Sequence, residues 1–211
     1  MGKKALFVVL VLSLFAGMTH AALITGVERL NPDGNSGDTP VEIAADLQNG
    51  SLTFVDRTHE YEELPAGLLG ADYIKVANDD KDNPNLQYDV TLSSGATMYL
   101  ILDNRLGHGN SDGGLDLVPD LVAAGMTWVT DMGFADTDLN VGIDEGGDGD
   151  IDQYSSVFSN DVAAGTISLF AQNDATNAGG RNNYGIAAVP EPATIALLGL
   201  GGLALIRRKR S

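Results

Sequence analysis

Residues 86–103 read LQYDVTLSSGATMYLILD, and they decide the fold class. In the first half every second residue from Leu86 to Leu92 is apolar, which is typical of a β-strand with one buried face. The second half, 96–103, is apolar almost throughout, which predicts a central strand buried on both faces. Because Ser94-Gly95 between them favours a tight turn, we expect the two strands to form a hairpin.

Similar short runs recur along the chain and predict ten strands. They span 41–47, 51–56, 71–77, 86–93, 96–103, 126–132, 137–144, 154–159, 165–172 and 184–189. Asn49-Gly50 favours a second hairpin, between 41–47 and 51–56. Turn residues separate the runs at the spacing of about 8–12 residues that is typical of sandwiches and jelly rolls. The predicted fold class is therefore all-β, a jelly-roll-like β-sandwich.

The two ends of the chain differ from this pattern. Lys3 and Lys4 precede an apolar stretch, and Thr19 and Ala21 are small residues at the −3 and −1 positions of a cleavage site. Residues 1–21 are therefore predicted to be a cleavable signal helix that uses the Sec translocon, with an uncleaved anchor as the alternative. This leaves 22–188 as one β-sandwich domain and 189–211 as a C-terminal signal.

The C-terminal signal has three parts. Pro190, Glu191 and Pro192 come first and should be extended, because proline cannot enter a helix interior. The run from Ala193 to Ile206 follows, and its 14 residues would form a short hydrophobic helix of about 21 Å, against about 30 Å of hydrocarbon core. Four basic residues then end the chain and would stop its transfer across the membrane: Arg207, Arg208, Lys209 and Arg210. We expect transient membrane insertion, with a retained tail anchor as the alternative.

This order of Pro-Glu-Pro, apolar run and basic cluster resembles the C-termini of the PEP-CTERM proteins. The stretch 70–105 also looks like β-sandwich modules of other exported PEP-CTERM proteins. The resemblance implies sorting by an exosortase, a membrane-embedded cysteine protease or transpeptidase that acts near the Pro-Glu-Pro motif. It further implies an exported product at the cell surface or in the extracellular matrix of a Gram-negative bacterium. It implies no particular activity.

The charge of the chain excludes several classes of partner. The whole chain carries a net charge of −17, and without its terminal segments it keeps 6 basic and 28 acidic residues, a net charge near −22. Such a surface repels phosphate backbones, so we expect no nucleic-acid binding.

The chain has no cysteine, which excludes disulfides, thiolate zinc sites and cysteine catalysis.

The densest candidate site is the loop IDEGGDGDID at 143–152. Its five acidic residues are Asp144, Glu145, Asp148, Asp150 and Asp152, and hard oxygen ligands on a glycine-rich loop suit Ca²⁺. The loop is no EF-hand, because Gly146 offers no side-chain ligand at position 3 and Ser155 stands at position 12 in place of the bidentate acid. A Ca²⁺ site of another kind and a solvated acidic turn are both left open, and no other cofactor is expected.

Trp128 is the single tryptophan, and its strand-like surroundings favour a core position over a sugar-binding platform.

We expect that the protein is not an enzyme. The sequence predicts a structural or adhesive surface protein that contacts extracellular polysaccharide, and the alternative is a secreted lyase or glycoside hydrolase that acts on matrix polysaccharide.

Overall fold

The computed structural model describes residues 22–32, 39–109, 114–173 and 180–191. The strands are β1 (Ile24–Leu30), β2 (Glu42–Ala44), β3 (Ser51–Leu52), β4 (Glu60–Glu62), β5 (Asp72–Lys75), β6 (Gln87–Leu92), β7 (Ala96–Asp103), β8 (Ala135–Asp144), β9 (Gln153–Val162), β10 (Gly165–Phe170) and β11 (Gly185–Pro190). Two short helices accompany them, η2 (Asn78–Asp82) and α2 (Trp128–Asp131).

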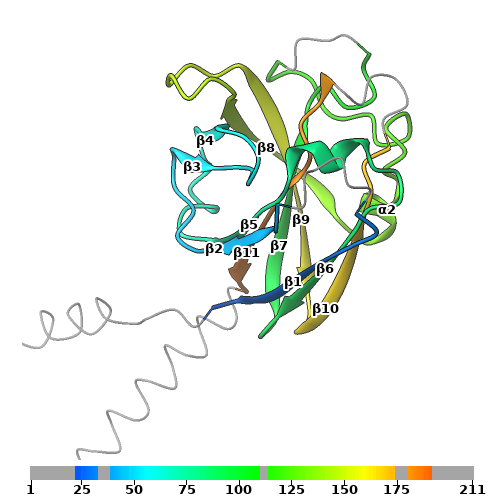
Figure 1. Cartoon of the computed structure of the whole chain (residues 1–211). Coiled ribbons are helices and arrows are strands. Elements are labelled where there is room, and N and C mark those ends of the chain that lie inside the picture. The colour runs from blue at the N-terminus through cyan, green and yellow to red at the C-terminus, as the bar shows by residue number, and fades with distance from the viewer. Residues whose placement is uncertain (1–21, 33–38, 110–113, 174–179, 192–211) are drawn as a thin grey trace, which may run out of the picture.

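The strands form two sheets that pack face to face (Figure 1). The smaller sheet has the order β1-β6-β10, and the larger has the order β2-β5-β11-β7-β9-β8-β4-β3. Neighbouring strands are antiparallel in both sheets. The predicted all-β sandwich is confirmed.

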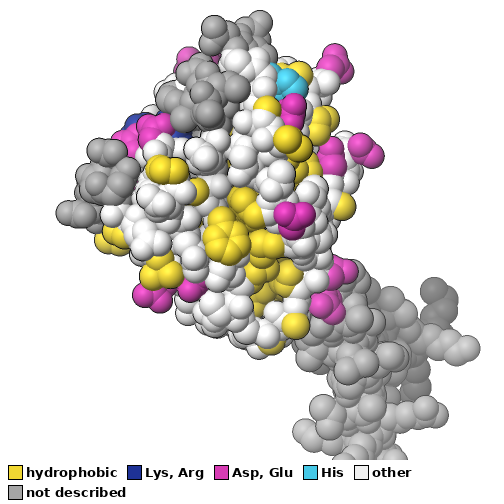
Figure 2. Space-filling model, turned by 90° about the vertical axis from the view of Figure 1, so that its right-hand side faces the viewer, with side chains coloured by type: hydrophobic (Ala, Val, Ile, Leu, Met, Phe, Trp, Pro, Cys, Tyr) yellow, Lys and Arg dark blue, Asp and Glu magenta, His cyan; other side chains and the backbone are white. Residues whose placement is uncertain are grey.

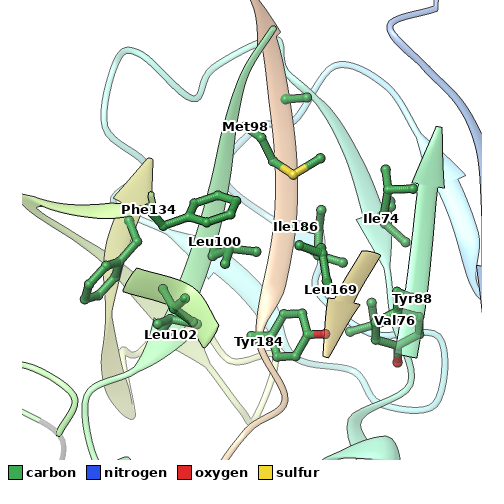
Figure 3. Close-up of a cluster of buried hydrophobic side chains, with 14 of the residues drawn as sticks. Ile74, Val76, Tyr88, Met98, Leu100, Leu102, Phe134, Leu169, Tyr184 and Ile186 are labelled. Carbon is green, nitrogen blue, oxygen red and sulfur yellow. The ribbon is translucent and has the colours of Figure 1, made fainter. Parts of the chain in front are cut away.

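The larger sheet is buried on both faces around β7. On its inner face Met98, Leu100 and Leu102 of β7 and Ile186 of β11 share an apolar cluster with Tyr88 of the smaller sheet (Figure 3). On its outer face Ile101 belongs to a second apolar cluster, which Leu47, Leu64 and Leu68 cover. The prediction that 96–103 is a central strand buried on both faces is confirmed.

The hairpin predicted at Ser94-Gly95 is wrong. β6 belongs to the smaller sheet and β7 to the larger, so the chain crosses between the layers at this turn. The physical reason lies in the burial of the two strands. β6 buries one face only, through Tyr88, Val90 and Leu92, whereas β7 needs a layer on each side.

The hairpin predicted at Asn49-Gly50 is also wrong, although a turn is present. Gly50 has a φ of 80°, and the Ser51 N–H donates to the Gln48 carbonyl at 3.0 Å. The flanking strands do not pair, because β2 pairs with β5 and β3 with β4, at opposite edges of the larger sheet. Asn-Gly reverses the chain locally, but it does not choose the partner strands.

Three further elements differ from the prediction. The strand predicted at 126–132 is α2, because Met126 and Val129, three residues apart, are both fully buried on one side. β1 and β4 were not predicted, since neither has a continuous apolar alternation.

Several predicted segments lie outside the described residues: the signal helix at 1–21, Pro192, the apolar run from Ala193 to Ile206 and the four basic residues at 207–210. Within the described ranges, no helix has the length and apolar character to cross a bilayer. At the C-terminal boundary of the domain, β11 continues to Pro190, two residues beyond the end predicted at residue 188.

Candidate functional site

The loops that follow β7, β8 and β10 and the loop that precedes β6 gather at one end of the sandwich. Asp103 at the end of β7 pairs with Ser155, and Phe170 at the end of β10 pairs with Gln87. The acidic loop 143–152, α2 and residues 180–184 all lie at this end, which we call the loop end. The start of β1 and the last residues of β11 lie at the opposite end (Figure 1).

The acidic loop connects β8 to β9 and is held by its own hydrogen bonds. The buried carboxylate of Asp144 accepts the backbone N–H groups of Gly146, Gly147 and Gly149 at 2.8, 2.6 and 2.6 Å. Asp152 accepts the N–H of Glu145 at 2.7 Å. The bonds to Asp144, that of Gly149 foremost, hold the pKa of its carboxyl below the usual range.

The candidate Ca²⁺ ligands therefore have different surroundings. Asp148, Asp150 and Asp152 are exposed, whereas Asp144 faces backbone N–H groups, and Glu145 turns toward Arg105. No group of three or more His or acidic residues in the described part of the chain is arranged to hold a metal ion. A Ca²⁺ site stays a prediction, and it would have to replace the N–H donors around Asp144. Bound Ca²⁺ would raise the melting temperature relative to EDTA.

The role of Asp144 can be measured in an acid titration. We expect Asp144→Ala to lower the melting temperature at neutral pH, because three N–H groups lose their acceptor. A carboxyl with a lowered pKa stabilises the fold above the unfolded value of about 3.9, and this stabilisation is lost as pH falls through the lowered folded value. The difference between the variant and the unaltered protein should therefore shrink in acid. Asp150→Ala, exposed in the same loop, is the control. A difference that stays constant in acid would contradict this role.

A buried polar network extends inward from Glu145. Its carboxylate accepts the Arg105 Nη2 at 3.2 Å and the Asn182 Nδ2 at 2.9 Å. Arg105 also donates Nε and Nη2 to the fully buried carboxylate of Asp103, at 2.9 and 2.6 Å, and the Asn182 N–H donates to the same carboxylate at 2.8 Å. The network joins the acidic loop to the end of β7.

The network continues into the space between the sheets. The Asn183 N–H donates to Asn78 Oδ1 at 2.8 Å, and Asn183 Nδ2 lies 3.4 Å from the Tyr88 hydroxyl, which donates to Asp80 at 2.5 Å. Burial, followed by the charge of Asp80, raises the pKa of Tyr88 well above its usual value. The sequence shows 173–183 only as a turn-rich segment, and nothing in its pattern indicates that Asn182 and Asn183 are buried.

A groove of about 330 Å³ opens at the loop end, and its lining includes both Trp128 and Phe170. Asn85, Gln87 and Asn173 contribute amides to its lining. Trp128 comes from α2 and Phe170 from the end of β10, and their rings meet edge to face at 5.9 Å. Phe170 is 42% exposed, which is unusual for so large an apolar side chain.

Gly125 allows the turn before α2 to pack closely against Asn173 in the lining of the groove. Gly125 has a φ of 64°, and a Cβ added there would lie 3.0 Å from the Asn173 carbonyl oxygen. The absence of a side chain lets the turn before α2 contact the chain after β10, where the Asn173 N–H donates to the Ala124 carbonyl.

Trp128 packs against the core and also lines the groove, and a sugar-binding role stays a prediction. Its ring packs against the buried Tyr184 at 5.8 Å, and its Nε1 donates to the Ala171 carbonyl at 3.1 Å. The same residue lines the groove. Figure 2 shows apolar side chains gathered in the middle of the face that carries β10 and α2, with acidic side chains spread around them.

Polar side chains continue from the groove along the outer face of the smaller sheet. Gln87 Nε2 and Ser168 Oγ both donate to Asp89, at 2.6 and 2.7 Å. The hydrogen bond from Ser168, followed by that from Gln87, lowers the pKa of Asp89. The face therefore combines exposed aromatic surface with a row of hydrogen-bonding groups.

The C-terminal segment of the chain matches a known sorting motif. Residues 188–210 match the model of the PEP-CTERM protein-sorting motif. The chain thus carries the signal of an exported protein that an exosortase recognises and that is sorted to the cell envelope or surface. Pro190 and Glu191 of this motif follow Val189 of β11 directly.

Two solved structures are similar to the domain. A β-glucuronidase from glycoside hydrolase family 2 is 16% identical with a TM-score of 0.54, over 83% of this chain and 15% of that chain. A GH138 enzyme targeting pectin rhamnogalacturonan II is 10% identical with a TM-score of 0.45, over 81% of this chain and 17% of that chain. The chain spans less than a fifth of the length of either enzyme, and the first likeness supports the sandwich fold alone. A search of curated protein sequences finds no significant match to the chain.

Proposed function

We propose that this exported protein is a structural or adhesive module of the cell surface or extracellular matrix that binds a neutral polysaccharide in the Trp128–Phe170 groove. The groove supports the proposal because it combines exposed aromatic surface with amides. The C–H faces of a sugar ring pack on aromatic rings, while amides exchange hydrogen bonds with its hydroxyls.

Charge favours a neutral polymer over a polyuronate. The domain has a net charge near −22, and at least four of its six basic residues are already paired with acids. These pairs are Arg29–Asp80, Arg57–Asp79, Lys75–Glu42 and Arg105–Asp103. A chain of carboxylated sugars would therefore meet repulsion over most of the surface.

The lining of the groove supports binding rather than catalysis. A lyase or glycoside hydrolase needs acid and base groups that face one cavity. Among the described residues, the groove lining includes no carboxylate. At the same end, Asp103 and Asp144 are engaged in internal hydrogen bonds.

Calorimetric titration tests the proposal. We expect the purified domain to bind a soluble neutral glucan, with dextran and hydroxyethyl cellulose as probes, and to show no binding to alginate, a polyuronate. Phe170→Ala should weaken binding about tenfold or more, because an aromatic anchor at the centre of a contact contributes at least about 1.4 kcal/mol. Leu139→Ala removes a similarly exposed apolar side chain, 46% exposed on β8, and should bind unchanged.

Two outcomes would contradict the proposal. The first is no binding to either neutral glucan, and the second is equal affinity of the Phe170→Ala variant. Release of reducing ends from any of these polymers would instead favour the enzyme alternative.

A further inference from the structure

The last strand of the domain lies in the middle of the larger sheet and leads directly into the sorting motif. β11 pairs with β7 over its whole length, from Gly185–Ile101 to Pro190–Ala96. On its other side it pairs with β5 from Ile186 to Ala188. Ile186, Ala187 and Ala188 are at most 1% exposed, and they contribute to both apolar clusters. The strand is therefore enclosed by neighbours and by both layers of the core.

The first residues of the motif are held at the edge of this arrangement. Pro190 is half-buried and opposite Ala96, and the side chain of Glu191 lies against Gly95. Only Glu191 and Pro192 separate Pro190 from the apolar run that begins at Ala193. Two extended residues reach about 7 Å, so a membrane-embedded enzyme that acts at the motif must approach the domain closely.

The start of the domain lies at the same end. Ser93 Oγ donates to the Ala22 carbonyl at 2.9 Å, and the Ser93 N–H donates to the Leu23 carbonyl at 2.9 Å. The Leu23 and Ile24 N–H groups donate to Asp72 at 2.5 and 3.1 Å. The turn 93–95 thus touches both the first residues of the predicted mature chain and Glu191.

The turns at this end are small and uncharged. The β6–β7 turn is Ser93-Ser94-Gly95, and the β9–β10 turn beside it includes Ala163 and Ala164. The acidic loop 143–152 lies at the opposite end. The acids beside these turns include Asp72, which accepts the N–H groups of Leu23 and Ile24, and Asp161, which accepts the Thr97 hydroxyl; Glu191 lies against Gly95. Turns without charged side chains suit close approach to a membrane, whose anionic lipids repel acidic surfaces.

We propose that the folded domain sets the upstream limit of tail removal at Pro190, and that the end formed by Ala22, the turn 93–95 and the β9–β10 turn is the face that docks on the sorting enzyme. The inference rests on sorting by an exosortase. The peptide bond that breaks lies on the carboxyl side of Pro190 or further downstream. Water completes the reaction, leaving a carboxylate on the domain and a free amine on the released segment.

The physical reason is access. A protease binds its substrate in an extended conformation, and residues 186–188 already have strand partners on both sides. A cut within them would require β11 to leave the sheet, which exposes both apolar clusters. A cut at or after Pro190 leaves the sandwich intact.

Native proteolysis of the purified full chain tests the limit without the sorting enzyme. We expect proteinase K at low temperature to leave a fragment whose C-terminus lies at or beyond Pro190, as read by intact mass. Above the melting temperature the cuts should extend into 185–189. A native fragment that ends before Pro190 would overturn the proposal.

The protein secreted by the bacterium that produces it tests the same limit after natural processing by the sorting enzyme. Intact mass should give a C-terminus at Pro190 or later. A product that ends before Pro190 overturns the limit while leaving sorting by the motif intact. A full-length product with its tail retained instead overturns the tail removal on which the inference depends.

A matched pair of substitutions tests the docking face. Ala164 and Ala123 are both exposed alanines, the first in the β9–β10 turn and the second at the loop end. We expect Ala164→Glu to slow tail removal several-fold in a pulse-chase experiment and Ala123→Glu to leave it unchanged, with equal melting temperatures for both. Equal processing of the two variants would overturn the docking face.

Discussion

A chain that ends at Asn183 should not fold, whereas a chain that ends at Glu191 should melt like the full-length protein. The shorter chain lacks β11, so β5 and β7 lose their common neighbour and the larger sheet is divided. Backbone groups of both strands lose their partners, and the loss of Ile186 and the alanines beside it leaves both apolar clusters open. The lost stabilisation exceeds the free energy of unfolding of an ordinary domain, which is roughly 5–15 kcal/mol.

Circular dichroism and thermal melting of the two truncated chains provide the measurement. The chain that ends at Glu191 is the matched control, because it lacks only the tail. A cooperative melting transition in the chain that ends at Asn183 would show that β11 is dispensable. The same result would remove the reason for placing the processing limit at Pro190.

The second large effect is expected at the buried ion pair of the loop end. Arg105→Ala should lower the free energy of unfolding by about 3–5 kcal/mol, because it leaves a buried carboxylate without its counter-charge. That carboxylate is Asp103, whose side chain is 0% exposed while that of Arg105 is 16% exposed. The substitution also removes one of the two side-chain donors to Glu145 of the acidic loop, while Asn182 remains as the other.

Urea denaturation measures this effect, and the surface pair Arg57–Asp79 supplies the control. The side chains of that pair are 34% and 36% exposed, so Arg57→Ala should change the free energy of unfolding by only about 0–1 kcal/mol. Equal losses for the two variants would contradict the special importance of the Asp103–Arg105 pair. The midpoint should shift without a change in the slope of the transition if both variants unfold in two states.

The residue pattern was a good guide to strands and a poor guide to their neighbours. β7 follows from an apolar run of eight residues, and β6 from a regular alternation. Their placement in different sheets does not follow, because a turn such as Ser94-Gly95 reverses the chain equally well within a sheet and between sheets. At 126–132 the apolar residues were too few to separate a strand from one helical turn, and the buried pair Met126 and Val129 decides the helix.

The candidate site was visible in part. The acidic loop is conspicuous in the sequence, but the orientation of Asp144 toward glycine N–H groups depends on the path of the β8–β9 loop. The groove joins Trp128 to Phe170, which are 42 residues apart along the chain, and a single-sequence pattern holds no signal for such a pairing. The burial of Asn182 and Asn183 could not be predicted either, because polar residues in a turn-rich segment are ordinarily exposed.

The sequence by itself determined the strand-rich fold class, the acidity from which we expect no nucleic-acid binding and the C-terminal sorting motif. These are properties of local composition and order, and the chain carries them before it folds. Only the tertiary structure decided which strands pair, which carboxylates are buried and where β11 lies. Those outcomes depend on the layers that bury each face of a strand, and residues far apart in the sequence supply these layers together.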